Sequence, residues 1–188
     1  LGLEAAGVKL GKKGEVIVDE YSRTNVESIY AVGDVTDRAN LTPVAIREGH
    51  AFADTVYGGK DVKVDHSIIP TAIFSQPEMG TVGLTEAQAR EKYDEVDIYK
   101  TAFRALKNTL SGSQERTFMK LVVDAKSDKV LGVHIMGPAS GELIQAVGIA
   151  VTSAVAVAPA NAALCVALAT PAAVAVTAAV GIARATAA

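Results

Sequence analysis

The sequence predicts an α+β fold in two parts, and two patterns lead to that prediction. In the first, a short apolar run ends at a glycine and an aspartate and is followed by a helical pattern over residues 43–57. In the second, strand-like runs lie between two further helical patterns. Because these strands follow one another through short connections, they should pair antiparallel, with the helices packed against the sheet.

The first pattern centres on residues 28–43, SIYAVGDVTDRANLTP. The run IYAV is β-prone, and Gly33 stops it, so a strand should end with Asp34 at its carboxyl edge. Thr42 can cap the following helix with its hydroxyl, and Pro43 suits the first helical position. Ligands of open α/β sheets bind at such an edge, beside helix N-termini. The stretch is therefore a candidate ligand-binding edge.

The other elements of the first part flank this edge. Residues 1–8 should form a short helix or loop, residues 11–14 a turn and residues 15–19 a strand. Gly58 and Gly59 should end the helix that begins at the candidate edge.

The second part begins after a polar and irregular stretch, which marks the expected domain boundary. Thr85 and Gln88 have capping-box spacing at the start of its first helix, residues 86–92. The strands of this part are predicted at residues 70–75, 79–83, 96–103, 117–125 and 130–136. The last helix should open at Ser140 or Gly141 and run to Val151. The expected divisions of the chain are residues 1–62, 63–151 and 152–188.

Composition excludes some functional classes. The 18 basic and 21 acidic residues form no basic stripe, so we expect no nucleic-acid partner. The single cysteine, Cys165, excludes an internal disulfide framework, and no basic segment followed by an apolar run opens the chain. We therefore expect a soluble, cytoplasmic protein. Because the chain opens at Leu1 within an apparent structural element, we also expect it to be a piece of a longer protein.

The character of the sequence changes after Val151. No residue between Glu142 and Arg184 is charged, and the stretch is rich in alanine and valine. Its length meets the simple test for a membrane span, but alanine drives insertion weakly and two prolines interrupt the run. A buried or interface helix pair and a disordered or artefactual tail are the alternatives. The sudden change would also suit a frameshift.

Four stretches, in this order, carry a resemblance to a known family. They are VIVDEYSRTNVESIYAVGDV, LTPVAIREGHAFADTVYGG, IPTAIFSQPEMGTVGLTEAQAREKY and MKLVVDAKSDKVLGVHIMGPASGELIQAVGIAV. Together they resemble the C-terminal part of the glutathione reductases, flavoproteins of the pyridine nucleotide-disulfide oxidoreductase family. The third stretch is more similar to glutathione reductases than to dihydrolipoamide dehydrogenases or mercuric reductases, which are the alternative relatives.

The resemblance implies that the first part is the end of an FAD-binding α/β domain. The second part would then be the antiparallel interface domain, through which the family forms homodimers. In this comparison Asp34 accepts a hydrogen bond from the ribityl chain of FAD, and Thr42 lies against the pyrimidine end of the flavin, with Gly33 and Leu41 beside them. The alternatives are a turn aspartate that caps local amides and an ordinary helix cap.

Three histidines carry weaker hypotheses. His50 falls where some family members hold glutathione through an arginine, so it is a candidate substrate contact, although a surface histidine is an equal alternative. His66 and His134 show no partner pattern, and His134, which alternates within a predicted strand, is interpreted as structural. We expect the carboxylates of the helix at 86–92 to form a solvated face, and no metal site is predicted.

The implied parent activity is the NADPH-dependent reduction of glutathione disulfide through FAD. The chain has no G-x-G-x-x-G turn, no cysteine pair and no NADPH domain. Residues 164–176, where the family has its acid/base histidine and glutamates, contain neither type. We therefore assign no catalytic residue and expect the isolated chain to be inactive and to hold FAD weakly. A catalytically inactive dimerisation module and, less favoured, a membrane-associated protein remain as alternatives.

Overall fold

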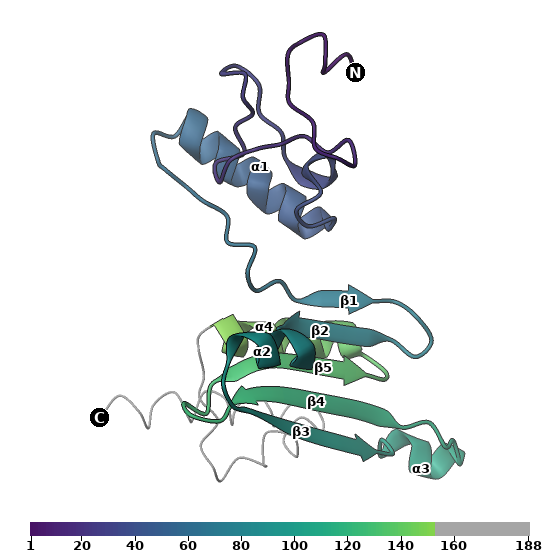
Figure 1. The fold of residues 1–188 in the computed structure, drawn as a ribbon. Helices are drawn as coiled ribbons and strands as arrows, with labels where there is room; N and C mark the ends of the chain where they lie inside the picture. Colours follow the sequence, from purple (N-terminus) through teal and green to yellow (C-terminus); the bar gives the residue numbers. More distant parts are fainter. Residues whose placement is uncertain (153–188) are drawn as a thin grey trace. The chain divides into compact units, whose positions relative to one another are not determined.

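A computed structural model describes residues 1–152. The chain divides into two compact units between His66 and Ser67, which we call unit 1 and unit 2 (Figure 1). Each unit is considered by itself. The sequence hypotheses for the tail concern residues beyond Thr152, outside the described part of the chain. Over residues 1–152 the structure has no helix of the length and hydropathy needed to cross a bilayer.

Unit 1 is built from loops around one helix. Helix α1 spans Thr42–Val56, one residue earlier at each end than the predicted 43–57, and the short 3-10 helix η1 spans Gly33–Thr36 beside it (Figure 1). The loops pack on α1 partly through aromatic contacts, because the Tyr30 ring meets the Phe52 ring edge-on at 4.9 Å between centroids. The C-terminal end of α1 leads into Gly59, whose φ of 66° turns the chain away from the helix.

The two strands predicted in unit 1 are not formed. The stretch at residues 15–19 makes one isolated bridge, between Val16 and Leu10, and the run at residues 29–32 makes one, between Tyr30 and Arg23. A strand needs a continuous ladder of hydrogen bonds to one neighbour. The other backbone bonds of the run at residues 15–19 go to different segments, as when the Val16 amide donates to the Val35 carbonyl oxygen at 2.8 Å, so no ladder forms among the described residues. The β-prone composition was therefore a wrong guide here.

The start of α1 also differs from the prediction by one residue. The carbonyl oxygen of Leu41 accepts hydrogen bonds from the amides of Val44 and Ala45, both at 3.0 Å, so Leu41 is the N-cap. Thr42 and Pro43 are then the first two helical residues, and the predicted side-chain cap by Thr42 is wrong. The reason is that the chain enters the helix directly from the extended backbone of Leu41, with φ −135° and ψ 128°.

Unit 2 is an antiparallel sheet of five strands in the order β1-β2-β5-β4-β3 (Figure 1). All five predicted strands are present. Their bounds are β1 Thr71–Ile73, β2 Met79–Gly83, β3 Val96–Phe103, β4 Thr117–Asp124 and β5 Val130–Met136. The hairpin between β4 and β5 sets their register, with Lys120 opposite His134, and β2 then pairs with the free side of β5.

Helix α4, Ser140–Thr152, covers one face of this sheet. Ile144 on α4 is fully buried against the sheet residues Val82, Leu121 and Val133. Each such side chain contributes about 1.5–3 kcal/mol when it leaves water. The helix approaches β2 closely because Gly80 has no side chain, and a Cβ there would lie 2.6 Å from the Ser140 carbonyl oxygen. The main core of unit 2 therefore lies between α4 and the sheet.

Helix α2, Glu86–Lys92, covers part of the other face. Its predicted capping box is confirmed, since the Thr85 hydroxyl accepts from the Gln88 amide and the Gln88 side chain accepts from the Thr85 amide. Ala89 packs there with Val122 and Leu131 in a second, smaller core. The structure adds one short helix that the sequence pattern did not predict, α3 at Lys107–Ser111.

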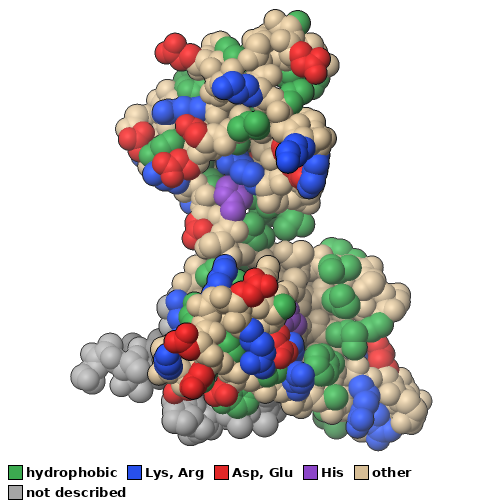
Figure 2. All heavy atoms as spheres, viewed as in Figure 1, with side chains coloured by type: hydrophobic (Ala, Val, Ile, Leu, Met, Phe, Trp, Pro, Cys, Tyr) green, Lys and Arg blue, Asp and Glu red, His purple; other side chains and the backbone are tan. Residues whose placement is uncertain are grey.

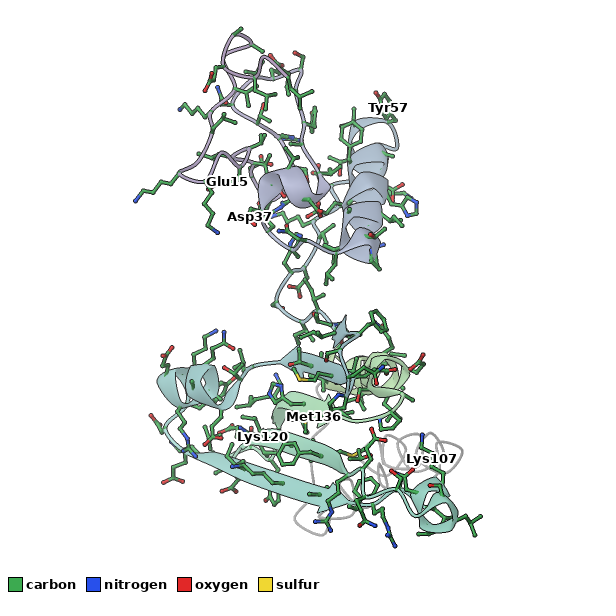
Figure 3. The ribbon with its side chains drawn as sticks, turned by 90° about the vertical axis from the view of Figure 1, so that its right-hand side faces the viewer. Glu15, Asp37, Tyr57, Lys107, Lys120 and Met136 are labelled. Carbon is green, nitrogen blue, oxygen red and sulfur yellow. The ribbon has the colours of Figure 1, made fainter. Side chains whose placement is uncertain are left out.

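The sequence predicted that the carboxylates of α2 form a solvated face, but one of them is held in ion pairs. Glu86 pairs with Lys120 of β4, which Figure 3 labels, at 2.6 Å and with Arg90 at 3.0 Å. Glu91 is exposed. Hydrogen bonds from Lys120 and Arg90 lower the pKa of Glu86 to about 2. The contact with Lys120 crosses 34 positions of the sequence, so helical periodicity alone could not reveal it.

This ion pair predicts a pH-dependent stability difference. Because the pKa of Glu86 is lowered in the folded state, its contribution is present above pH 4.5 and is lost as the pH falls towards about 2. Glu86→Gln should therefore destabilise unit 2 at pH 7, and its stability should converge with that of the unchanged chain in acid. Urea unfolding followed by circular dichroism between pH 2 and 7 measures the difference. Glu91→Gln is the matched control, and an equal pH trend in both variants would contradict the prediction.

Candidate functional site

A tight turn at the start of η1 is the first component of the candidate site. Gly33 is buried and has a φ of 74°, a conformation that side-chain-bearing residues rarely adopt. A Cβ at Gly33 would also lie 3.0 Å from the Cβ of Ala45, so the turn lies directly against the first turn of α1. Figure 3 shows η1, which ends next to the labelled Asp37, alongside α1. Glycine is therefore required both for the turn and for its contact with the helix.

Asp34 follows Gly33 and projects from the turn. Its side chain is exposed, and the carboxylate makes no hydrogen bond or ion pair to any residue that the structure describes, although the Asp34 carbonyl oxygen accepts from the Asp37 amide at 3.0 Å. An ionised carboxylate accepts hydrogen bonds and donates none. Asp34 therefore presents acceptor atoms to the surroundings of the turn.

The start of α1 is the second component. Its N-cap, Leu41, makes no side-chain hydrogen bond to the helix, and the first turn contains no acidic residue. Thr42 is exposed, and as the first helical residue it has an amide with no acceptor inside the helix. A helix N-terminus carries the equivalent of about half a positive charge. The start of α1 can therefore donate to an electron-rich or anionic group.

Glu48 on α1 supports the turn from within unit 1. Its side chain is only 1% exposed, and its Oε2 accepts a hydrogen bond of 2.6 Å from the Gly33 amide. Its Oε1 lies 2.9 Å from Nη2 of Arg38 and 2.7 Å from Nε2 of His66. The buried carboxylate thus has three partners from three different segments.

Arg38 and Thr36 extend this network around the turn. The Arg38 guanidinium also donates to the Ser22 hydroxyl at 2.9 Å. The Thr36 hydroxyl donates to the Gly33 carbonyl oxygen at 2.8 Å. Both the amide and the carbonyl of Gly33 are therefore held, the first by Glu48 and the second by Thr36.

Sequence reasoning missed Glu48, although one signal was available. Glu48 lies four residues after Val44 and three before Ala51, so it falls on the side of α1 that packs inward. An acidic residue at such a position indicates a buried partner, because a buried charge without one is strongly unfavourable. The pattern reveals that a partner exists but does not identify it.

The three histidines differ in their surroundings. His50 is exposed on α1 and makes no contact with the Glu48 network. The sequence pattern indicated no partner for His66, and the structure shows that its Nε2 is hydrogen-bonded to Oε1 of Glu48 at 2.7 Å. His134 is half-buried in unit 2, which lowers its pKa. Its Nε2 donates to the Leu84 carbonyl oxygen at 3.2 Å, and its Nδ1 then accepts from the Thr81 hydroxyl at 2.7 Å. These bonds agree with a structural role for His134.

No metal centre is visible in residues 1–152, because no three His, Cys, Asp or Glu side chains converge there as ligands. The candidate site is therefore a polar edge, formed by the Asp34 carboxylate and the start of α1.

Comparison with known proteins assigns the family. Residues 69–179 match the pyridine nucleotide-disulphide oxidoreductase dimerisation domain, and residues 1–49 match the pyridine nucleotide-disulphide oxidoreductase domain. The chain belongs to the pyridine nucleotide-disulfide oxidoreductase family. The second match contains the Gly33 turn, the start of α1 and Glu48. The matches confirm the resemblance and the predicted fold class, the end of an FAD-binding domain followed by an antiparallel dimerisation domain.

Several relatives within this family are closely similar to the chain. The glutathione reductase of Burkholderia cepacia is 54% identical over 80% of this chain and 34% of its own length. The chloroplastic/mitochondrial glutathione reductase of Pisum sativum is 52% identical over 79% of this chain and 27% of its own. The trypanothione reductase of Trypanosoma congolense is 48% identical over 79% of this chain and 30% of its own length. The chain therefore spans roughly a third of the length of these relatives.

The Glu48 network predicts that Arg38 stabilises unit 1. Arg38→Met leaves the buried carboxylate without its guanidinium partner, which should cost about 3 kcal/mol of unfolding free energy. Hydrogen exchange of α1 amides at increasing urea concentration measures this free energy for unit 1 alone. Arg47→Met is the control, because Arg47 is exposed and has no partner among the described residues. Equal losses in the two variants would show that the ion pair does not stabilise unit 1.

Proposed function

We propose that unit 1 is the flavin-contacting edge of an FAD-dependent disulfide oxidoreductase that reduces glutathione disulfide with NADPH. The observation that carries the proposal is the exposed Asp34 carboxylate, which has no partner in residues 1–152, on a turn held against the start of α1, which has no side-chain cap. Membership of the family supports FAD as the cofactor. The names of the relatives support glutathione as the substrate.

The residues present fit a flavin cofactor chemically. The ribityl chain of FAD carries hydroxyl groups, and Asp34 offers them an acceptor that no described residue uses. A reduced flavin gathers negative charge at its pyrimidine end, and the start of α1 at Leu41 and Thr42 stabilises such charge by about 1 kcal/mol. Gly33 allows the turn to lie against the first turn of α1, because a Cβ there would lie 3.0 Å from the Cβ of Ala45. When bound, FAD would supply the hydride-accepting chemistry, and these four residues would hold and orient it.

We infer that this chain contributes to the activity without completing it. Reduction of a disulfide through a protein dithiol needs two thiols, and Cys165 is the single cysteine of the sequence. The chain alone is therefore proposed to give no NADPH-dependent reduction of glutathione disulfide. His50 remains a proposed contact for the substrate, since it is exposed on α1.

The assembly that we propose is a homodimer formed through unit 2. The match of this unit to a dimerisation domain supports the proposal. Large apolar side chains are also exposed on unit 2, among them Phe74 at 82%, Leu106 at 77% and Leu110 at 97%. Burying such side chains against a second copy would remove apolar surface from water.

The cofactor proposal predicts a localised response to FAD. In the isotope-labelled full chain, FAD at millimolar concentration should shift the amide resonances of Gly33, Asp34, Leu41 and Thr42 in NMR spectra. Asp34→Ala should weaken this response at least about tenfold, because it removes a hydrogen bond to a charged acceptor. Asp97→Ala is the control, since Asp97 is exposed on β3 of unit 2. Absence of the response, or the same loss in both variants, would contradict the flavin edge.

The homodimer proposal predicts weak, concentration-dependent association. Sedimentation equilibrium of the full chain should show dimer at high concentration, and Leu110→Ser should weaken the association about tenfold by removing one buried leucine. Ile17→Ser is the matched control, because Ile17 is an apolar residue of unit 1 and is 51% exposed. A chain that stays monomeric at every concentration would overturn the homodimer.

A further inference from the structure

We propose that Glu48 is a positioning residue for the flavin edge. In this inference its buried carboxylate sets the direction in which Asp34 leaves the Gly33 turn, and Arg38 and His66 hold that carboxylate in place. The inference rests on the proposed function, because it concerns how the flavin-contacting residues are presented. Glu48 itself is too deeply buried to contact a ligand.

A buried carboxylate at position 48 needs a reason, because it is costly for stability. Removing a carboxylate from water costs several kcal/mol, and an apolar side chain of similar volume is often equally stabilising. Glu48 is 1% exposed and lies on the inward side of α1, where leucine would suit the packing. An apolar residue could not accept the hydrogen bond from the Gly33 amide, which is the one backbone group of the turn that Glu48 holds.

The two carboxylate oxygens of Glu48 bind different partners. Arg38 and His66 both bind Oε1, at 2.9 and 2.7 Å, whereas the Gly33 amide binds Oε2 at 2.6 Å. The cationic and ring donors orient the carboxylate, and its second oxygen is then directed at the turn. Charge-assisted hydrogen bonds of this length are about twice as strong as neutral ones.

The direction of Asp34 depends on how Gly33 is held. Glu48 holds the amide of Gly33, and the Thr36 hydroxyl holds its carbonyl. Fixing the peptide groups on both sides of the Gly33 Cα fixes its φ and ψ, including the φ of 74°. The direction of the next residue, Asp34, follows from these two angles. Glu48 therefore acts on the flavin edge through Gly33.

Because the two oxygens of Glu48 bind different donors, Glu48→Gln tests whether the carboxylate holds the Gly33 turn. Glutamine has nearly the same shape but only one acceptor oxygen. If that oxygen faces Gly33, the amide NH2 faces the Arg38 guanidinium, which can only donate. If the side chain is flipped, the NH2 faces the Gly33 amide. In either orientation one donor meets another, so the hold on the turn is weakened.

The experiment compares Glu48→Gln with Glu91→Gln in the full, isotope-labelled chain. Glu91 is exposed on α2 of unit 2, so its variant controls for the chemical change alone. Hydrogen exchange of the Gly33 amide should be at least about tenfold faster in Glu48→Gln and unchanged in Glu91→Gln. In addition, FAD should shift the Asp34 amide at least about tenfold more weakly in Glu48→Gln. Unchanged exchange at Gly33 in a folded Glu48→Gln would overturn the proposal.

A measurement on the unchanged chain covers the case in which Glu48→Gln does not fold. A scalar coupling between the Gly33 amide nitrogen and the Glu48 carboxylate carbon reports the hydrogen bond directly, and its absence would overturn the proposal. The FAD titration separates the two hypotheses. No FAD response in the unchanged chain would overturn the proposed function, while the Gly33 measurements would still decide whether Glu48 holds the turn. An equal FAD response in the unchanged chain and in Glu48→Gln would overturn the positioning role alone.

Discussion

Unit 1 depends on the hydrogen bonds and ion pairs of the buried Glu48 carboxylate. This carboxylate joins the Gly33 turn, the loop at Arg38 and the segment at His66 to helix α1. The fully buried apolar side chains of unit 1 in the described residues are small in number and size, with Val8, Val16 and Ala51 among them. A polar network therefore replaces much of the apolar core that usually holds loops on a helix, and a change in charge at Glu48 should affect the whole unit.

Unit 2 is stabilised by a different kind of interaction. Helix α4 packs Ile144 into an apolar layer against the sheet, and α2 closes a smaller layer on the opposite face. Acidic and basic side chains are interspersed on the visible surface of the chain (Figure 2). Two units with such different cores should respond differently to mutation, since polar networks are sensitive to lost partners and apolar cores to lost volume.

This difference suits the roles proposed for the two units. A cofactor edge needs acceptors and donors in fixed directions, and hydrogen-bond networks impose direction. An association surface exposes apolar side chains, so the unit that carries it needs a separate apolar core to stay folded. In unit 2 the sheet packed on α4 is such a core. Family membership supports the proposed cofactor and assembly, whereas the geometry around Gly33 suggests how residues of this chain would serve them.

Local patterns alone were sufficient to predict α1, the capping box of α2 and all five strands of unit 2, because each is stabilised by residues near in sequence or by hairpin neighbours. The strands predicted at residues 15–19 and 29–32 failed because a strand depends on neighbours that composition does not specify. The partners of Glu48 and Glu86 lie up to 18 and 34 positions away. Only the folded chain brings such distant groups together, so tertiary structure decided which charges are paired and which, like the Asp34 carboxylate, have no partner among the described residues.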